Sequence, residues 1–480
     1  MNKYKKIVFF AFLTIFVSFV IFSKKLGDMD EIWNYNFANC ISKGLIPYRD
    51  FNIVQMPLLP IVLGIILKTT INSLIIIRIV SVLLWISVFI TIYKILKKFK
   101  FSDSLIYCCI FIISIILKDY YTIDYNIFSV FLVLLILLFE LSSKKELKIN
   151  DFIVGILAGL VVLTKQTIGL TVCIGIIFYR LITLFGTTNW KDLFLRIIIR
   201  IIGISIPIAL FIVYLLYNNS ILYFWDYAVL GLKTFSNKIS YISLFSNNSI
   251  IIVELSILIP LFWIFFFIYY FKGKDKNYLL LLIFSLSTFI LSFPISDSIH
   301  FLYGSIVSLI GVMYFINNLF CNRFKSNVKI KKLFIIFYCV FIIMYLYYSV
   351  FCFMNINYLS TLNHFKYIPI DKNMEKNIIE LDSYILGSNK KVYILNFDAA
   401  LYMIPIDKYN KDYDMFLKGN LGIHGEDGQI DKIKKSNALF LITKENIKRN
   451  WQNPEKVRKY VLFNLKKVDD IGFFEVYSWM

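Results

Sequence analysis

The sequence has no cysteine motif with metal-binding spacing, no internal repeat and no low-complexity segment. Its seven cysteines form no C-x-x-C pair, and the segment after Cys352 contains none. Closely spaced cysteine pairs mark disulfide frameworks and structural zinc sites, and repeats of about 20–50 residues mark solenoids and propellers. The sequence therefore predicts neither a disulfide-rich domain, nor a zinc module, nor a repeat protein.

Acidic residues are also few. The chain has 31 of them against 51 lysines and arginines, which gives a formal charge of +20. A basic chain can in principle bind nucleic acid. Here, however, the basic residues cluster in short loops between apolar runs, a pattern typical of proteins oriented in a membrane. We therefore expect no nucleic-acid partner.

Apolar sequence is what the chain has in excess. Hydrophobic residues make up 59% of it, against about 45–50% in soluble domains. They are concentrated in runs of about 20 residues, the length that crosses a bilayer. The N-terminal run resembles a signal peptide but lacks a small-residue cleavage site, so we interpret it as an uncleaved first span. The sequence predicts an α-helical polytopic membrane protein in contact with the lipid bilayer.

About eleven membrane crossings are expected from these runs. They fall near residues 7–23, 74–94, 104–117, 125–141, 152–164, 168–185, 196–217, 249–271, 278–293, 301–320 and 333–353. A further apolar stretch, 57–69, is too short to cross and is expected to be an interfacial or re-entrant helix.

Positive charge gathers in alternate loops. The loop residues of this set include Lys94, Lys97, Lys98, Lys144, Lys145, Lys272, Lys274, Arg323 and Lys325. By the positive-inside rule the face that carries them is cytoplasmic, together with the N-terminus. The segments expected to face outward from the plasma membrane are 24–56, 118–125, 164–166, 218–247, 294–300 and the C-terminal tail.

The composition changes to that of a soluble domain after about residue 358. The expected strands are 391–396, 438–442 and 472–477, and the expected helices are 371–386 and 454–463. We therefore predict two domains. Residues 1–357 form a transmembrane module with 24–56 as its first outward loop, and residues 358–480 form a small extracytoplasmic α/β domain.

The unusual polar residues collect on the predicted outward face. They are Asp28, Asp30, Glu31, Arg49, Asp50, Asp119, Asp124, Lys165, Asp297 and His300. Ionisable residues at the membrane edge are functional candidates by default. A carboxylate beside an apolar wall can act as a base, and lysine, arginine or histidine can hold a phosphate. Together these groups suggest transfer chemistry on a lipid phosphate.

Residues 27–60 (GDMDEIWNYNFANCISKGLIPYRDFNIVQMPLLP) resemble the first outward loop of the GT-C glycosyltransferases. The acidic pair Asp30-Glu31 is followed by KGLIPYRDF and by the proline-rich MPLLP. The resemblance extends to Arg78, to the Thr-Lys pair of GLVVLTKQTIGL and to the FPISDSIHF loop. Among these enzymes the chain is similar to bacterial relatives of the protein O-mannosyltransferases and to the aminoarabinose transferase of lipid A.

The resemblance implies an inverting enzyme that moves a hexosyl or pentosyl group from a polyprenyl-phosphate donor. The acceptor would be a glycan, lipid or protein of the cell envelope. Asp30 or Glu31 would deprotonate the acceptor hydroxyl, and no nucleotide, metal or other cofactor would be obligatory. The residues that bind the donor phosphate or support the substrate would be Lys165, His300, Arg49, Asp297 and Asp28.

The acidic residues also allow other interpretations. Asp28-Met29-Asp30 matches D-x-D, the motif with which cytosolic glycosyltransferases bind a divalent cation and a nucleotide sugar. The loop is predicted to face outward, where nucleotide sugars are scarce, which disfavours that motif. Asp30 and Glu31 could instead stabilise the N-terminus of a helix.

The basic residues have structural alternatives as well. Lys165 could extend its ammonium to the interface, and His300 could be an interface histidine with a structural partner. An ion pair between Arg49 and Asp50 would fix the loop without any substrate.

Two other functional classes remain open on the sequence. A transporter or a flippase for lipid-linked sugars would also be polytopic, although such proteins often show paired repeats and a site near the bilayer midplane. A membrane-anchored scaffold would leave Asp30, Lys165 and Asp297 without a role.

Overall fold

The structure is a computed structural model. It describes residues 2–142, 148–184, 190–234, 238–246, 248–326, 328–409, 411, 416–444 and 453–479. Among the loop residues used to predict orientation, Lys144 and Lys145 lie outside the described residues, and so do the side chains of 320–335.

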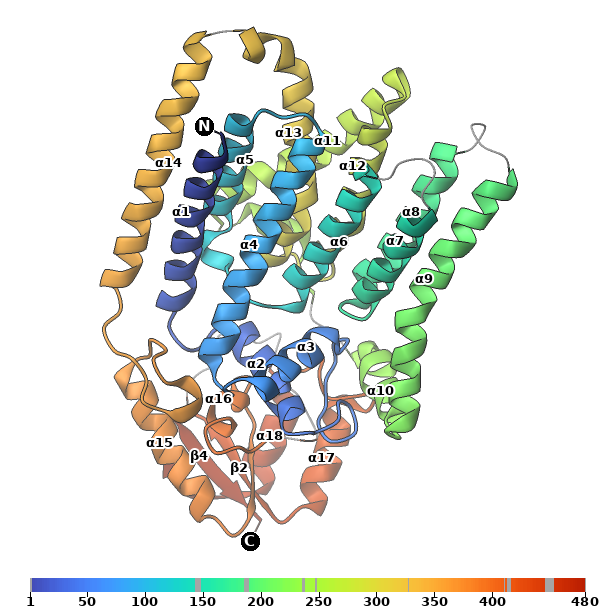
Figure 1. Ribbon diagram of the computed structural model, residues 1–480. Coiled ribbons are helices and arrows are strands. Elements are labelled where there is room, and N and C mark those ends of the chain that lie inside the picture. Colours follow the sequence, from blue (N-terminus) through green and yellow to red (C-terminus); the bar gives the residue numbers. More distant parts are fainter. Residues whose placement is uncertain are drawn as a thin grey trace. The chain divides into compact units, whose positions relative to one another are not determined.

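The chain is mostly helical and carries one small sheet (Figure 1). The α-helices are α1 (Asn2–Ser23), α2 (Met29–Ser42), α3 (Leu58–Thr69), α4 (Leu74–Lys98), α5 (Asp103–Ile116), α6 (Tyr125–Ser142), α7 (Lys148–Val162), α8 (Gln166–Leu184), α9 (Trp190–Tyr217), α10 (Ile221–Phe224), α11 (Ile250–Gly273), α12 (Lys276–Phe289), α13 (Ser298–Ser326), α14 (Val328–Met354), α15 (Lys372–Gly387), α16 (Ala399–Met403), α17 (Gly425–Lys435) and α18 (Glu455–Asn464). The strands are β1 (Lys391–Ile394), β2 (Ala438–Thr443), β3 (Lys466–Ile471) and β4 (Phe474–Ser478).

These elements form two compact units. Unit 1 comprises Met1–Ile21, Ile79–Leu210 and Lys238–Asn355. Unit 2 comprises Phe22–Arg78, Phe211–Asn237 and Ile356–Met480. Most of the long apolar helices belong to unit 1, and the sheet belongs to unit 2.

Eight helices in the described part of the chain are long and apolar enough to cross a membrane: α1, α4, α6, α8, α9, α11, α13 and α14. The other three expected crossings are shorter, because α5, α7 and α12 have 14, 15 and 14 residues, or about 21 Å of helix. Helix α3 has 12 residues and is shorter than a crossing, as expected. By length and composition the chain is a multi-pass membrane protein.

Helices α6, α7 and α8 pack in succession within unit 1 (Figure 1), and glycines bring α7 unusually close to α9. A Cβ atom on Gly159 would lie 2.6 Å from the carbonyl oxygen of Ile204, and one on Gly203 would lie 2.6 Å from that of Phe152. Gly155 faces Gly203 at the same crossing. Small residues four apart allow such close backbone contact between membrane helices.

Charged side chains of four helices meet beside this crossing in what we term the arginine cluster: Glu140, Asp151, Arg180, Arg196 and Arg200. Asp151 is fully buried and accepts hydrogen bonds from all three guanidinium groups, at 2.6–3.0 Å. Arg200 also lies 2.6 Å from Glu140. Opposite charges in direct contact explain how five ionisable groups are tolerated among apolar helices.

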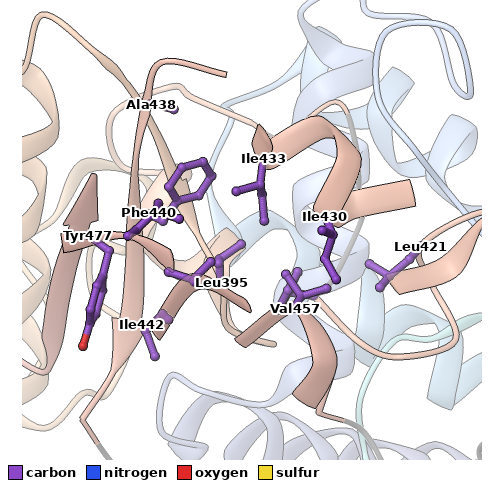
Figure 2. Packing of buried hydrophobic residues seen from close by; sticks show 12 residues of the cluster. Leu395, Leu421, Ile430, Ile433, Ala438, Phe440, Ile442, Val457 and Tyr477 are labelled. Carbon is purple, nitrogen blue, oxygen red and sulfur yellow. The ribbon is translucent and has the colours of Figure 1, made fainter. Parts of the chain in front are cut away.

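The sheet of unit 2 has the order β1-β2-β4-β3, with β1 and β2 parallel and the other pairs antiparallel. All six residues of β2 are buried, as expected for a central strand covered on both faces. Phe440 and Ile442 face the helices α17 and α18, where they pack with Ile433 and Val457 (Figure 2). Apolar side chains at alternate strand positions thus build the core on this face.

The three strands expected from sequence are confirmed as β1, β2 and β4, and the two expected helices as α15 and α18. Strand β3 was missed. Its sequence, KKVDDI, is almost entirely exposed and has no apolar alternation, because it lies at the edge of the sheet.

Candidate functional site

The acidic stretch of residues 28–31 forms the first turn of helix α2 in unit 2. Asp28 is the N-cap, and its side chain accepts hydrogen bonds from the backbone N–H groups of Asp30 (3.1 Å) and Glu31 (3.3 Å). Gly27, at φ +127°, provides the backbone conformation that leads into this cap. Asp28 therefore has the capping role that sequence analysis left open for its neighbours.

Glu31 forms a buried ion pair with Arg78. Both of its carboxylate oxygens accept from Arg78, at 2.8 Å each, and the two side chains are 5% and 0% exposed. Arg78 also donates to the backbone oxygen of Lys24, at 2.8 Å. A fixed guanidinium thus occupies both carboxylate oxygens of Glu31, so the geometry gives Glu31 a structural role.

Asp30 is the remaining acid of the turn and is partly exposed. Its backbone oxygen accepts from the side chain of Asn34 at 2.8 Å, which fixes the backbone at this position. The cap at Asp28 and the ion pair at Glu31 hold the residues on both sides of it. The first turn of α2 thus presents Asp30 from a rigid support.

Arg49 and Asp50, also in unit 2, form an ion pair with each other. This ion pair was one of the two roles considered for Arg49 from sequence; the other was binding of the substrate. Two guanidinium nitrogens of Arg49 donate to the two carboxylate oxygens of Asp50, each at 2.9 Å. Asp50 accepts in addition from the backbone N–H of Ile46 at 2.8 Å. The hydrogen bonds from Arg49 hold the pKa of Asp50 below its ordinary value. This contact stabilises the loop that follows α2.

Lys165 belongs to unit 1, where it precedes helix α8. Its ammonium donates to the side-chain oxygen of Asn126 at 2.6 Å and lies 5.0 Å from the ring centre of Tyr125. Asn126 in turn donates to Asp124 at 2.9 Å. A neutral amide thus stands between the buried carboxylate and the cation.

Asp124 is fully buried at the start of α6, where it also accepts from the backbone N–H of Ile127 at 2.8 Å. Burial raises the pKa of Asp124 above its ordinary value. The hydrogen bonds from Ile127 and Asn126, and the nearby Lys165 and His300, act in the opposite direction without overcoming it.

Asp297 and His300 form a pair at the start of α13. The Nδ1 atom of His300 lies 2.7 Å from the carboxylate of Asp297, and the backbone N–H of His300 donates to the same oxygen at 2.9 Å. Burial alone would raise the pKa of Asp297, but the hydrogen bonds from His300 and the charge of Lys165 bring it below its ordinary value. The carboxylate therefore fixes the ring of His300.

The charge of Lys165 acts on Asp297, and the charges of Lys165 and His300 act on Asp124, so these groups belong to one part of unit 1. We term Asp124, Asn126, Lys165, Asp297 and His300 the lysine cluster. Asp124 was among the candidate residues expected from sequence, whereas Asn126 was not. An Asn two residues after an acid at a helix start could have suggested this hydrogen bond.

Aromatic side chains hold the loop before Asp124. Trp85 donates to the backbone oxygen of Thr122 at 3.0 Å, and Tyr121 donates to that of Ser114 at 2.7 Å. Trp85 and Tyr121 are fully buried, with ring centres 4.7 Å apart. The lysine cluster is therefore built on a fixed loop.

The predicted site residues thus fall in two sets. Asp28, Asp30 and Glu31 share one turn of unit 2, where Arg49 is engaged separately with Asp50, and Lys165, Asp297 and His300 share one cluster of unit 1. Within the described residues, no three His, Cys, Asp or Glu side chains are arranged to hold a metal ion.

Comparison with known proteins identifies the fold. No protein-family model and no curated protein sequence matches the chain. Among solved structures, ArnT from Cupriavidus metallidurans bound to undecaprenyl phosphate is similar over 98% of this chain and 97% of its own, with a TM-score of 0.58 and 11% identity.

Two archaeal structures are similar as well. The Archaeoglobus fulgidus oligosaccharyltransferase tethered with an acceptor peptide matches 92% of this chain and 70% of its own, with a TM-score of 0.53 and 12% identity. AglB from the same organism, in complex with an inhibitory peptide and a dolichol-phosphate, matches 99% and 75%, with a TM-score of 0.52 and 11% identity. The chain therefore shares the fold of these structures, in agreement with the fold that the resemblance of its first outward loop implied.

Proposed function

We propose that the protein is a glycosyltransferase that moves a sugar from a polyprenyl-phosphate donor to an acceptor of the cell envelope. The observation that carries this proposal is the likeness to ArnT, a structure bound to undecaprenyl phosphate, over nearly the whole of both chains. The acidic turn of α2 and the lysine cluster supply the two kinds of group that such a transfer needs. Fold alone does not fix an activity, so the residues carry the rest of the argument.

Asp30 acts as the general base. It takes the proton of the acceptor hydroxyl as the oxygen attacks the anomeric carbon of the sugar, while the bond from that carbon to the donor phosphate breaks. The bonding electrons leave with the polyprenyl phosphate. A single displacement of this kind inverts the anomeric configuration.

Lys165 and His300 stabilise the negative charge that develops on the leaving phosphate. Asp297 orients the ring of His300, at 2.7 Å. Asn126 orients the ammonium of Lys165, at 2.6 Å, without neutralising its charge. The proposed step requires no metal ion.

The charge of the loops sets the proposed orientation. The basic loops face the cytoplasm together with the N-terminus, and residues 358–480 lie outside the plasma membrane. The donor lipid and the acceptor are then used on the outer face.

A strain that lacks the gene tests the proposal. Mass spectrometry of its envelope glycans and lipid-linked sugars should show one missing sugar modification and accumulation of the polyprenyl-phosphate sugar. The wild-type gene should restore the modification, whereas Asp30→Asn should lower transfer by about 10²–10⁴-fold, the usual contribution of a general base.

Asp119→Asn is the matched control, because this exposed acid pairs with Lys118 and has no part in the proposed step. It should restore transfer fully. An unchanged envelope in the deletion strain, or full activity of Asp30→Asn, would refute the proposal.

A further inference from the structure

A chain of side-chain contacts attaches helix α2 to two later segments of unit 2. The hydroxyl of Tyr35 lies 2.8 Å from Nδ1 of His364, and Nε2 of His364 lies 3.0 Å from a carboxylate oxygen of Asp407. The same oxygen of Asp407 also accepts from Lys43, at the end of α2. One imidazole and one carboxylate thus hold the C-terminal half of α2.

The surrounding contacts make this attachment specific. His364 lies in a short 3-10 turn, Asn363–Phe365, and its side chain is 12% exposed. The next residue, Phe365, is fully buried, and its ring centre lies 6.2 Å from that of Tyr35. Ser73 donates to the backbone oxygen of His364 at 3.3 Å. The turn is therefore fixed against α2 and cannot adjust freely when the contacts of the ring change.

The number of protons on His364 decides how these contacts are satisfied. A neutral ring donates from Nε2 to Asp407 and accepts at Nδ1 from the hydroxyl of Tyr35. A protonated ring donates from both nitrogens, so the hydroxyl of Tyr35 must turn its proton to another acceptor. Asn72 offers one at 3.3 Å, which is a longer contact than the 2.8 Å to the ring.

We propose that His364 is a positioning residue for the catalytic carboxylate: in its neutral form it fixes α2, which presents Asp30 in its first turn, and its protonation loosens that helix. The assignment of Asp30 as the group that is positioned rests on the proposed function. The effect of His364 protonation on helix α2 is independent of the proposed function.

The charges that face His364 determine the direction of the effect. Lys43 and Tyr35 face it from α2, Asp407 from the turn after α16, and the backbone of Asn72 from the loop before α4. Burial lowers the pKa of His364, and Lys43 acts in the same direction, while Asp407 and Asn72 oppose it. A lowered pKa means that the detached state binds protons more readily than the attached state. The attachment is therefore complete at pH values above about 6.5 and weakens as the pH falls below that value.

Hydrogen exchange measured by mass spectrometry on the purified full chain in detergent tests this inference. Exchange of α2 peptides is followed between pH 5.5 and 7.5 and corrected for the intrinsic rate at each pH. In the wild type, corrected exchange should rise as the pH falls. His364→Gln cannot become charged and should remove that rise, and Tyr35→Phe should increase exchange about tenfold at pH 7.5 through the lost hydrogen bond.

Helix α18, which lies in the same unit and carries no histidine, serves as the internal reference and should not respond. Sugar transfer is then followed against pH in membranes of the complemented deletion strain, where the wild type should lose activity at low pH and His364→Gln should lose this dependence. Corrected α2 exchange that is independent of pH in the wild type, or unchanged in Tyr35→Phe, overturns the inference. If α2 exchange depends on pH as expected but the wild type transfers no sugar, the proposed function is refuted and the attachment of α2 by His364 stands.

Discussion

The arginine cluster and the lysine cluster are two sets of charges in unit 1, built in opposite ways. In the first, Asp151 is surrounded by three guanidinium groups that touch it directly. In the second, Asp124 reaches Lys165 through the neutral amide of Asn126. Both carboxylates are fully buried.

We propose that this difference separates a structural use of charge from a chemical one. Direct contact between opposite charges compensates each of them and holds helices together, but it leaves little charge for a ligand. Lys165 contacts the neutral amide of Asn126, and its charge acts on Asp124 and Asp297. We propose that this arrangement leaves it able to attract an incoming anion. Variants of the two clusters should therefore affect different properties.

The largest effect is expected at Asp151. Replacement by leucine leaves three buried guanidinium groups without their shared partner and should lower the free energy of unfolding by about 3–5 kcal/mol. Thermal unfolding in detergent measures the loss. Asp192→Asn is the control, because Asp192 is 33% exposed and pairs with Arg196 at the rim of the cluster, so its loss should cost at most about 1 kcal/mol. Equal effects of the two variants would show that the cluster is not a unit.

Lys165→Met should lower activity and leave stability nearly unchanged, the reverse of what we expect at Asp151. Loss of a cation that stabilises the leaving phosphate should reduce transfer by about 10²–10³-fold, while the unfolding temperature changes little. Lys165→Arg is the matched variant: it keeps the charge but replaces an ammonium with a planar fork, and should retain part of the activity. If the Lys165→Met protein transfers sugar normally but unfolds at a lower temperature, the lysine cluster has a structural role like that of the arginine cluster.

A smaller effect is expected where α7 and α9 cross. Gly159→Ala places a methyl group 2.6 Å from the carbonyl oxygen of Ile204, so the helices must separate, at a cost of about 1–3 kcal/mol. Gly273→Ala is the control, because a Cβ there meets nothing within 4 Å. If both alanines prove neutral in thermal unfolding, the arginine cluster holds these helices without the close backbone approach.

The sequence was sufficient to predict the membrane class and most of the α/β elements, because these depend on apolar periodicity and run length. The fold was predicted from the resemblance of short motifs, such as those of residues 27–60, to a known family. Strand β3 escaped because an exposed edge strand has no such pattern. The three short helices were counted as crossings because an apolar run does not reveal where its helix begins and ends.

The candidate site could be predicted only as a set of residue types. Glu31 and Arg78 are 47 positions apart, and their ion pair forms only when the chain folds. The same holds for Tyr35 and His364, which are 329 positions apart. Local sequence shows which residues carry charge, whereas the fold decides which charges are compensated.

Strand β3 has a consequence for self-association. It is the last strand of the sheet, so one row of its backbone N–H and C=O groups has no partner strand in the described residues, and such an edge can recruit a second chain. Lys466, Lys467, Asp469 and Asp470 cover it with hydrated charges of both signs. Charged, exposed edges of this kind disfavour strand addition. The features that hid β3 from sequence analysis thus protect this edge against aggregation.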